Sequence, residues 1–339
     1  MKNFRNFQNK EISFGAQKNI IIGNNGRGKS NILEALSIPS APLVESKPEY
    51  LLMQGEESLF LKYSLDSGVA SYSYSSDGSK RKYILSGKST TKSRMRENYP
   101  IVVSFHPMMM NLMYLGPSQR RDFLDNILIQ SFPKYSKILS NYKKVLTSRN
   151  RVLKNISEGK SSSSELSFWD DKYIESAVTI YKYRGELSKF FKENTPELKE
   201  YFFGKAQDIS FEYISKTKLD SPENYLRDYI EKNQQKEILL RKTLRGPHLD
   251  DFDIIIDSTP LTHFASRGEV KSILLGLKFL ETKFLEKYCP EKDVLFLIDD
   301  FLSELDAEHR DLLWLHIGSR QSVISSIIDF PVEGNKIFI

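Results

Sequence analysis

The stretch "IIIGNNGRGKSNILEAL" spans residues 20–36 and joins a candidate strand to a candidate helix. Its three isoleucines are β-branched and apolar, which is typical of the end of a buried strand. Residues 31–36 contain helix formers with one apolar side. Between them, Gly23 to Ser30 matches G-x-x-x-x-G-K-[ST], a loop that binds phosphates. The sequence therefore predicts nucleoside triphosphate binding. The alternative is a glycine-rich turn with a chance Lys-Ser, which the strand–loop–helix context disfavours.

The loop assigns a role to each kind of residue in it. Glycines turn backbone N–H groups inward onto phosphates, and the helix N-terminus adds partial positive charge. We expect Lys29 to reach the β- and γ-phosphates of ATP and to act in catalysis, and the Ser30 hydroxyl to ligate Mg²⁺. The nucleotide-binding candidates are Gly23, Asn24, Asn25, Gly26, Arg27, Gly28, Lys29, Ser30 and Asn31.

A second apolar run, "VLFLIDD" (294–300), ends in two carboxylates and has the form of a Walker B strand. We expect Asp299 to bind Mg²⁺, directly or through water, and Asp300 to orient or activate the attacking water. Acids that merely follow a strand are the alternative. One Mg²⁺ needs both a hydroxyl and a carboxylate nearby, so the two motifs support each other. They lie about 270 residues apart, so the elements between them must be inserted into one nucleotide-binding fold.

Composition bounds the class of protein. The 339 residues suggest two or three domains or lobes, and no apolar run approaches the roughly 18 residues of a membrane span. The N-terminus has no signal-peptide core, and the single cysteine, Cys289, fits a reducing cytoplasm. Net charge is only +5, yet residues 80–96 carry seven basic residues and residues 143–154 carry five, each without an acid. Two such clusters suit a polyanion, although a solvated face is the usual explanation for one.

The pattern along the chain changes twice. The first hundred residues alternate like strands, and Asp77-Gly78 indicates a hairpin. Residues from about 107 to 244 are helical in pattern, with a serine-rich break at 157–164. From Asp251 the chain returns to a strand-like run, then a helix over about 270–288, then the Walker B strand.

Two further stretches narrow the class. "ASRGEVKSILLGLKFL" begins a long helix with Ser266, Gly268 and Glu269, and "FLSELD" places Asp306 after the Walker B strand. The set resembles an ABC-type ATPase, in which the signature of one subunit closes on the γ-phosphate held by the other. The resemblance implies that Ser266, Gly268 and Glu269 act in trans and that Asp306, in the D-loop, crosses the dimer interface. The Glu269 carboxylate would repel a γ-phosphate unless it points away or pairs with Lys271.

The full set of motifs resembles the RecF family of recombinational-repair proteins over nearly the whole chain. The motifs are "FRNFQ" (4–8), the P-loop, "GPSQRRDFLD" (116–125), "YKKVLTSRNRVLK" (142–154), "LSFWDDKY" (166–173), "RGPHLDD" (245–251), "ASRG" (265–268) and "LIDDFLSELD" (297–306). The resemblance implies an α/β fold: an ABC-type ATPase head, with a P-loop mixed sheet and a flanking antiparallel β subdomain, plus a helical second lobe. We expect residues 1–106 and 245–339 to form the ATPase lobe and 107–244 the inserted helical lobe.

The family relation also implies a function. It predicts a weak ATPase that uses ATP and Mg²⁺, dimerises on DNA with ATP at the interface, and acts with RecR and RecO in RecA loading at gaps, in DNA replication, repair and the SOS response. The DNA would be duplex or a gapped junction, and the location cytoplasmic. From charge, the DNA-contact candidates are Arg120, Arg121, Lys143, Lys144, Arg149, Arg151 and Lys154. For the two adjacent arginines, an ion pair with Asp122 or Asp125 is the alternative.

Two other functions stay open from the sequence. An ABC transporter ATPase subunit would share the motifs, but the last core strand, "SVISSII", offers Ser325 and Ser326 and no switch histidine. A DNA clamp that binds ATP without useful turnover is the second, because Asp300 is shorter than a glutamate and Glu269 brings negative charge to the signature.

Overall fold

The computed structural model describes residues 1–41, 47–202, 208–261, 267–329 and 333–339. The chain forms two compact units. Unit 1 combines Met1–Met109 with Leu274–Ile339, and unit 2 is the segment Met110–Ile273 between them. Each unit is described by itself.

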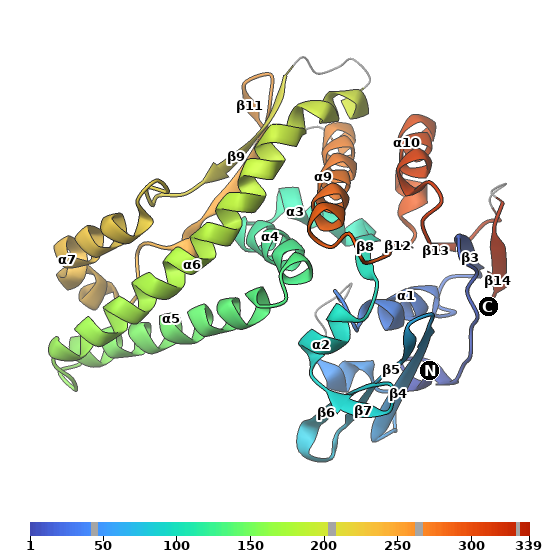
Figure 1. Cartoon of the computed structure of the whole chain (residues 1–339), viewed down its shortest axis with the longest axis horizontal. Helices are drawn as coiled ribbons and strands as arrows, with labels where there is room; N and C mark the ends of the chain where they lie inside the picture. Colours follow the sequence, from blue (N-terminus) through green and yellow to red (C-terminus); the bar gives the residue numbers. More distant parts are fainter. Residues whose placement is uncertain (42–46, 203–207, 262–266, 330–332) are drawn as a thin grey trace. The chain divides into compact units, whose positions relative to one another are not determined.

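Unit 1 contains a five-stranded sheet in the order β14-β3-β13-β12-β8, and its neighbouring strands are parallel (Figure 1). β12 and β13 are buried along their whole length, as strands covered on both faces are. Because β13 pairs with both β3 and β12, the carboxyl ends of the P-loop strand and the Walker B strand lie at one edge of the sheet. The strands are β3 (Lys18–Ile22), β8 (Ile101–Phe105), β12 (Val294–Ile298), β13 (Ser322–Ser326) and β14 (Asn335–Phe338).

A second sheet of unit 1 has six antiparallel strands in the order β2-β1-β4-β5-β6-β7. Burial alternates along β4, as expected for a sheet with one face on the core. The hairpin predicted at Asp77-Gly78 is confirmed, since Ser75 pairs with Lys80 across it. The strands are β1 (Lys2–Phe4), β2 (Phe7–Asn9), β4 (Ser58–Leu65), β5 (Gly68–Ser75), β6 (Lys80–Leu85) and β7 (Lys88–Thr90).

Helix α1 (Lys29–Ser37) follows the P-loop and packs into a core shared with both sheets. The Tyr63 hydroxyl of β4 donates to the Ala35 carbonyl over 2.8 Å, and that of Tyr99 donates to the Leu36 carbonyl over 2.9 Å. The buried cluster includes Ile32 and Leu33 of α1, Leu59 and Leu61 of β4, and Leu297 and Val323 of the parallel sheet. This packing fixes the helix, and therefore the loop before it, against the framework.

The remaining helices of unit 1 lie along the rest of its chain. They are η1 (Pro48–Leu51), η2 (Asp77–Ser79), α2 (Lys92–Glu97), η3 (Pro107–Met110), α9 (Arg267–Tyr288), η6 (Phe301–Glu304) and α10 (Ala307–Ile317). Two of them cross the boundary between the units: η3 ends one residue inside unit 2, and α9 begins in unit 2 and continues into unit 1.

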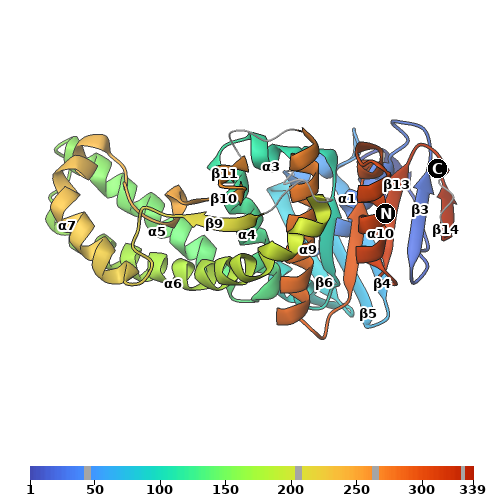
Figure 2. The same ribbon diagram turned by 90° about the horizontal axis from the view of Figure 1, so that it is seen from above.

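Unit 2 is built on long helices with a small sheet. Helices α5 and α6 run alongside each other, and α7 packs against both (Figures 1 and 2). The serine-rich break is confirmed, because α5 ends at Ser157 and α6 begins at Ser164. The helices are α3 (Asn111–Tyr114), α4 (Pro117–Ser131), α5 (Tyr135–Ser157), α6 (Ser164–Asn194), η4 (Thr195–Phe202), α7 (Pro222–Leu240) and η5 (Pro247–Leu249).

A small sheet places the C-terminal boundary of unit 2 later in the chain than the expected residue 244. Its order is β11-β10-β9, from β9 (Ile209–Ile214), β10 (Asp251–Ile256) and β11 (Thr259–Pro260). All six residues of β10 pair with β9, and Phe252 stacks on Phe211 with ring centroids 5.2 Å apart. Residues 245–273 therefore belong to unit 2 and not, as we expected, to the ATPase lobe. Within the described residues, no helix is long and apolar enough to cross a membrane.

Candidate functional site

The P-loop backbone adopts conformations that only glycine takes without strain. Gly26 has φ 79° and Gly28 has φ 101°. A Cβ at Gly28 would also lie 2.6 Å from Phe7 Cζ and 2.7 Å from the Asn6 side-chain amide. The helix begins immediately afterwards at Lys29. The loop therefore brings the N-terminus of α1 and its free backbone N–H groups to the edge of the sheet.

Lys29 lies within the loop and not in solvent. Its side chain is buried, and its ammonium donates to the Gly23 carbonyl over 2.9 Å and to the Asn24 carbonyl over 3.3 Å. The charge is thus held beside the backbone that would surround a phosphate. A triphosphate offers the same ammonium stronger, charged acceptors, so the site fits an anion.

The P-loop and the Walker B strand meet at one hydrogen bond. The Ser30 hydroxyl donates to Asp299 Oδ1 over 2.9 Å, although the two residues are 269 positions apart in the chain. A hydroxyl and a carboxylate are hard oxygen donors of the kind that Mg²⁺ prefers. The pair therefore fits a magnesium ion and would hold it at the end of the P-loop. Burial raises the pKa of the Asp299 carboxyl, while hydrogen bonds from Ser325 and Ser30 act in the opposite direction.

Ser325, at the end of β13, contacts both Walker B acids. Its hydroxyl donates to Asp299 Oδ1 over 2.8 Å and accepts the backbone N–H of Asp300 over 2.8 Å. The Asp300 carboxylate lies 3.3 Å from the same hydroxyl. Asp300 itself has φ 47°, in the left-handed region that costs energy for a residue other than glycine. One buried hydroxyl thus bonds both to the strained turn at Asp300 and to Asp299, the candidate metal ligand.

The sequence predicts no role for Ser325 beyond the absence of a switch histidine in its strand. The position of Ser325 at the carboxyl end of the last apolar strand was a usable signal, because adjacent parallel strands end at the same edge. The missing information was the pairing of β12 with β13, which no local pattern gives.

The N-terminal hairpin also contributes to the site, a role that sequence reasoning missed. The Asn6 side chain donates to the Arg27 carbonyl over 3.1 Å and accepts from Asn31 Nδ2 over 2.8 Å. The neighbouring Arg5 makes a two-point ion pair with Glu34 of α1, over 2.8 and 2.7 Å. The turn in "FRNF" (4–7) therefore holds the P-loop and α1 in place, and the Asn31 side chain bonds to Asn6 of this turn.

The signature and D-loop residues are described only in part. Ser266 lies outside the described residues. Gly268 is exposed in the first turn of α9, where the Glu269 carboxylate suits the positive end of the helix dipole. Asp306 caps α10: its carboxylate accepts the backbone N–H of His309 over 2.9 Å and contacts His309 Nδ1 at 2.7 Å. Its side chain is still 64% exposed, so a role at an interface stays a prediction.

Two DNA-contact candidates, Arg120 and Arg149, are wrong because their side chains are buried in ion pairs. The Arg120 guanidinium bonds both Asp251 oxygens, over 2.6 and 2.8 Å, and also two backbone carbonyls. Its partner is thus Asp251, and neither of the two acids named as the alternative. Neighbouring Arg121 is half-buried and donates to the Asp250 carbonyl over 2.8 Å.

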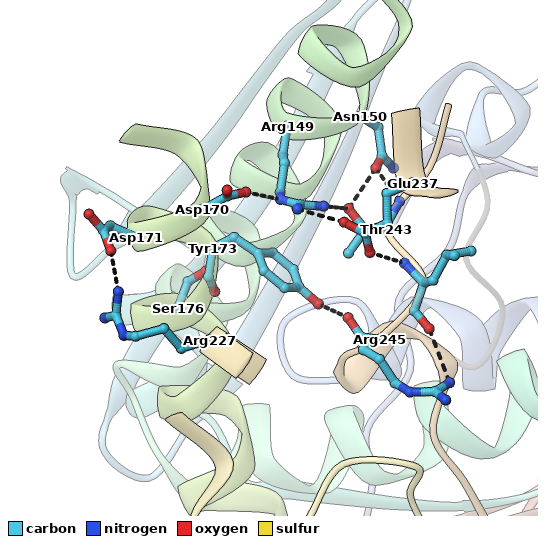
Figure 3. A network of polar contacts seen from close by, with 11 residues as sticks. Arg149, Asn150, Asp170, Asp171, Tyr173, Ser176, Arg227, Glu237, Thr243 and Arg245 are labelled. Carbon is cyan, nitrogen blue, oxygen red and sulfur yellow. Dashed lines mark hydrogen bonds and ion pairs between the residues drawn. The ribbon is translucent and has the colours of Figure 1, made fainter. Parts of the chain in front are cut away.

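Arg149 is fully buried at the centre of a network that joins α5, α6 and α7 (Figure 3). It donates to Asp170 over 2.7 Å, to Glu237 over 2.6 Å and to Thr243 over 2.8 Å. Burial works against the charged guanidinium, but the two carboxylates raise its pKa. The Arg149 side chain is therefore fully engaged inside unit 2 and cannot contact DNA. The other candidates on α5 are exposed: Lys143, Lys144, Arg151 and Lys154.

Comparison with known proteins agrees with this geometry. A family model described as an AAA domain matches residues 1–38. The DNA replication and repair protein RecF of Cyanothece sp. is 30% identical over 338 residues, covering 96% of this chain and 89% of its own. That of Ruminiclostridium cellulolyticum is 31% identical over 350 residues, covering 96% and 90%.

The solved structures point the same way. One of the recombination mediator protein RecF-ATPrS in the RecFOR pathway has a TM-score of 0.89 at 26% identity, covering 100% of this chain and 94% of that one. A second, of RecF-ATP, has a TM-score of 0.89 at 25% identity. The chain shares about 30% sequence identity with RecF proteins over nearly its full length, and it has the same ABC-type ATPase fold. The chain therefore belongs to the RecF family of DNA replication and repair proteins.

Proposed function

We propose that this protein is an ATP-dependent, DNA-binding recombination mediator that dimerises on DNA with ATP at the interface and hydrolyses it slowly. The observation that carries the proposal is the hydrogen bond between Ser30 and Asp299, which unites the P-loop and Walker B in one site. ATP is supported further by the RecF-ATP structure that the chain resembles.

Each residue of the site has a separate task in this proposal. Lys29 and the loop N–H groups bind the phosphates, and Ser30 with Asp299 holds Mg²⁺, which neutralises phosphate charge when bound. Asp300 orients the water that attacks the γ-phosphate and accepts its proton. In the dimer, Ser266 and Gly268 of the partner subunit close on the γ-phosphate.

The position of Asp300 supports slow hydrolysis. Its side chain is one methylene shorter than a glutamate, and its backbone is held in a left-handed turn by Ser325. A water misplaced by ~1 Å can cost on the order of 10²-fold in rate. ATP binding would then assemble a long-lived dimer, and hydrolysis would release it.

The biological setting comes from the family. We propose that the protein acts in the cytoplasm with RecR and RecO in loading RecA at gapped DNA, in keeping with the RecFOR pathway named for the solved relatives. Arg121 and the exposed basic residues of α5, Lys143, Lys144, Arg151 and Lys154, stay candidates for duplex contact.

A DNA clamp without useful turnover is the second candidate, favoured by the constrained Asp300. An ABC transporter subunit is not, because the chain belongs to the RecF family. The test measures DNA affinity with ATP, ADP and no nucleotide, beside single-turnover hydrolysis. Tighter DNA binding with ATP and measurable turnover would support the mediator, and ATP-dependent binding with no turnover would support the clamp. A DNA affinity that is the same with ATP, with ADP and without nucleotide would contradict both the mediator and the clamp.

A further inference from the structure

The antiparallel sheet of unit 1 has one face that its core does not use. Alternate residues of β4, such as Leu59 and Leu61, are buried in the core, while Ser58, Phe60 and Lys62 between them are exposed. Strand register assigns partners to the same face, because side chains directly opposite each other point the same way. The outer face of β4, β5 and β6 therefore carries Ser58, Phe60, Lys62, Ser71, Ser73, Ser75, Lys80, Lys82 and Ile84.

Two cross-strand rows give this outer face its chemistry. The first row runs Lys2, Phe60, Ser73, Lys82, from β1 through β4 and β5 to β6. The second row runs Ser58, Ser75, Lys80. Neighbours in such rows have Cβ atoms about 4.5–5.5 Å apart. A large aromatic side chain, 40% exposed, thus lies between lysines and hydroxyls.

The rows form a shallow cleft of about 620 Å³, lined among others by Lys2, Phe60, Ser73, Lys80 and Lys82. One acid also lines it, Asp77, which lies at the turn between β5 and β6. Among the described residues, Lys2, Lys62, Lys80 and Lys82 make no ion pair, whereas Lys154 of α5 lies within 4.0 Å of Glu158. The positive charge of this face is therefore available to an external anion.

We propose that this outer face binds single-stranded DNA. The inference rests on the proposed DNA-binding function and adds a location and a strand preference to it. Lysines and serine hydroxyls suit successive phosphates, and an exposed aromatic ring gives a base something to stack on. Bases in a duplex are already stacked on each other, so the aromatic contact favours a single strand. The acid-free run that begins at Lys80 thereby gains a role separate from the α5 cluster.

The test compares three variants by fluorescence anisotropy with a single-stranded oligonucleotide and a duplex of equal length, over a salt series. One variant is Lys62→Gln with Lys82→Gln, and another is Phe60→Thr, which keeps a β-branched residue in the strand. The matched control is Lys182→Gln with Lys192→Gln, two exposed lysines of α6 that change net charge equally. ATP turnover without DNA serves as the check of folding, since none of these residues belongs to the nucleotide site.

The expected result is specific to the single strand. The lysine variant lowers the slope of log affinity against log salt by about 0.7 for each lysine lost, and the control does not. Phe60→Thr weakens single-strand binding about 5- to 150-fold, the loss of one stacked base, and changes duplex binding much less. If the wild type binds single-stranded DNA and the variants bind it equally well, the outer face is not the binding surface, but the proposed DNA-binding function stands. A wild-type protein that binds neither DNA in any nucleotide state would overturn the proposed function as well.

Discussion

At the scale of single residues, the Ser325 hydroxyl positions both Walker B acids, Asp299 and Asp300, through hydrogen bonds. It donates a hydrogen bond to Asp299, as Ser30 also does, and accepts the backbone N–H of the strained Asp300, and Ser325 is 1% exposed. A group that orients a metal ligand commonly matters 10- to 100-fold to metal affinity. The side-chain hydroxyl of Ser326, the next residue, bonds instead to the backbone carbonyl and N–H of Ile328.

Ser325→Ala should therefore weaken the apparent Mg²⁺ affinity in ATP hydrolysis by roughly 10- to 100-fold. It should also cost about 1–3 kcal/mol of stability, since the Asp300 N–H loses its buried partner. Ser325→Thr keeps the hydroxyl and should restore the Mg²⁺ dependence. Ser326→Ala is the matched control. Magnesium titrations of turnover that are the same in Ser325→Ala and wild type would remove the positioning role.

Asp300→Asn should bind ATP and Mg²⁺ but hydrolyse ATP at least about 10²-fold more slowly, because an amide cannot accept the proton of the attacking water. Wild-type turnover itself should fall well below the ~10 s⁻¹ typical of enzymes. The measurement is single-turnover hydrolysis beside the lifetime of the ATP complex on DNA after dilution. An Asp300→Asn protein that hydrolyses like wild type would show that another group handles the water.

At the scale of elements, the structure separates local signals from non-local ones. The strand–loop–helix around Lys29, the hairpin at Asp77 and the serine-rich break between α5 and α6 are encoded within a few residues, so their prediction succeeded. β9 and β14 were missed, because β9 is defined by pairing with β10 and β14 by pairing with β3. β14 is short and mostly exposed, so it shows no clear burial pattern. β9 does alternate apolar and polar residues, but it lies between helical runs and its partner β10 is distant in the sequence.

The same distinction explains the mistaken DNA candidates. Arg149 and Arg151 look alike in a basic run, yet one is fully buried and the other exposed. The partners that decide this, Asp170 and Glu237, come from other helices, 21 and 88 positions away. Charge patterning alone gives the composition of a helix but not which of its faces is packed.

These two arginines make a matched pair of substitutions on one helix. Arg149→Ala should destabilise the protein by about 3–5 kcal/mol, since it leaves buried carboxylates without their counter-ion. Arg151→Ala should change stability by less than about 0.5 kcal/mol and lower the salt slope of duplex binding by about 0.9 if it contacts a phosphate. Chemical denaturation and DNA titration report on both. Equal stability of the two variants would contradict the buried network of Figure 3.

At the scale of the whole molecule, burial of histidines couples stability to pH. Burial lowers the pKa of His106 to about 4, of His248 to about 4 and of His316 to about 3. An unfolded chain would protonate these side chains near pH 6.5. Because the folded values are depressed, their stabilising contribution is complete above about pH 6.5 and is lost as the pH falls toward 4.

The free energy of unfolding should therefore fall on acidification, by up to about 1.4 kcal/mol per pH unit for each histidine concerned. Buried carboxyls with raised pKa, such as Glu281, act with the opposite sign, so the comparison must be between variants. His316 packs against the Phe279 ring, and its Nε2 has no hydrogen-bond partner among the described residues. His316→Leu should therefore flatten the pH dependence of the free energy of unfolding. Denaturation curves at several pH values from 7 to 5 give the free energy of unfolding of each protein. An equal change of this free energy with pH in wild type and His316→Leu would contradict the role of His316.

In the proposed function, the P-loop and Walker B form one nucleotide switch whose ATP state is a dimer on DNA. The most direct measurement is the mass of the protein bound to a short gapped duplex, by sedimentation equilibrium with ATP and with ADP. Lys29→Ala is the paired variant, because it removes the buried ammonium that lies against the Gly23 carbonyl. We predict two chains of 39.3 kDa per DNA for wild type with ATP, and one with ADP or for Lys29→Ala with either nucleotide. The same mass with ATP and ADP, or a Lys29→Ala protein that dimerises like wild type, would contradict the account.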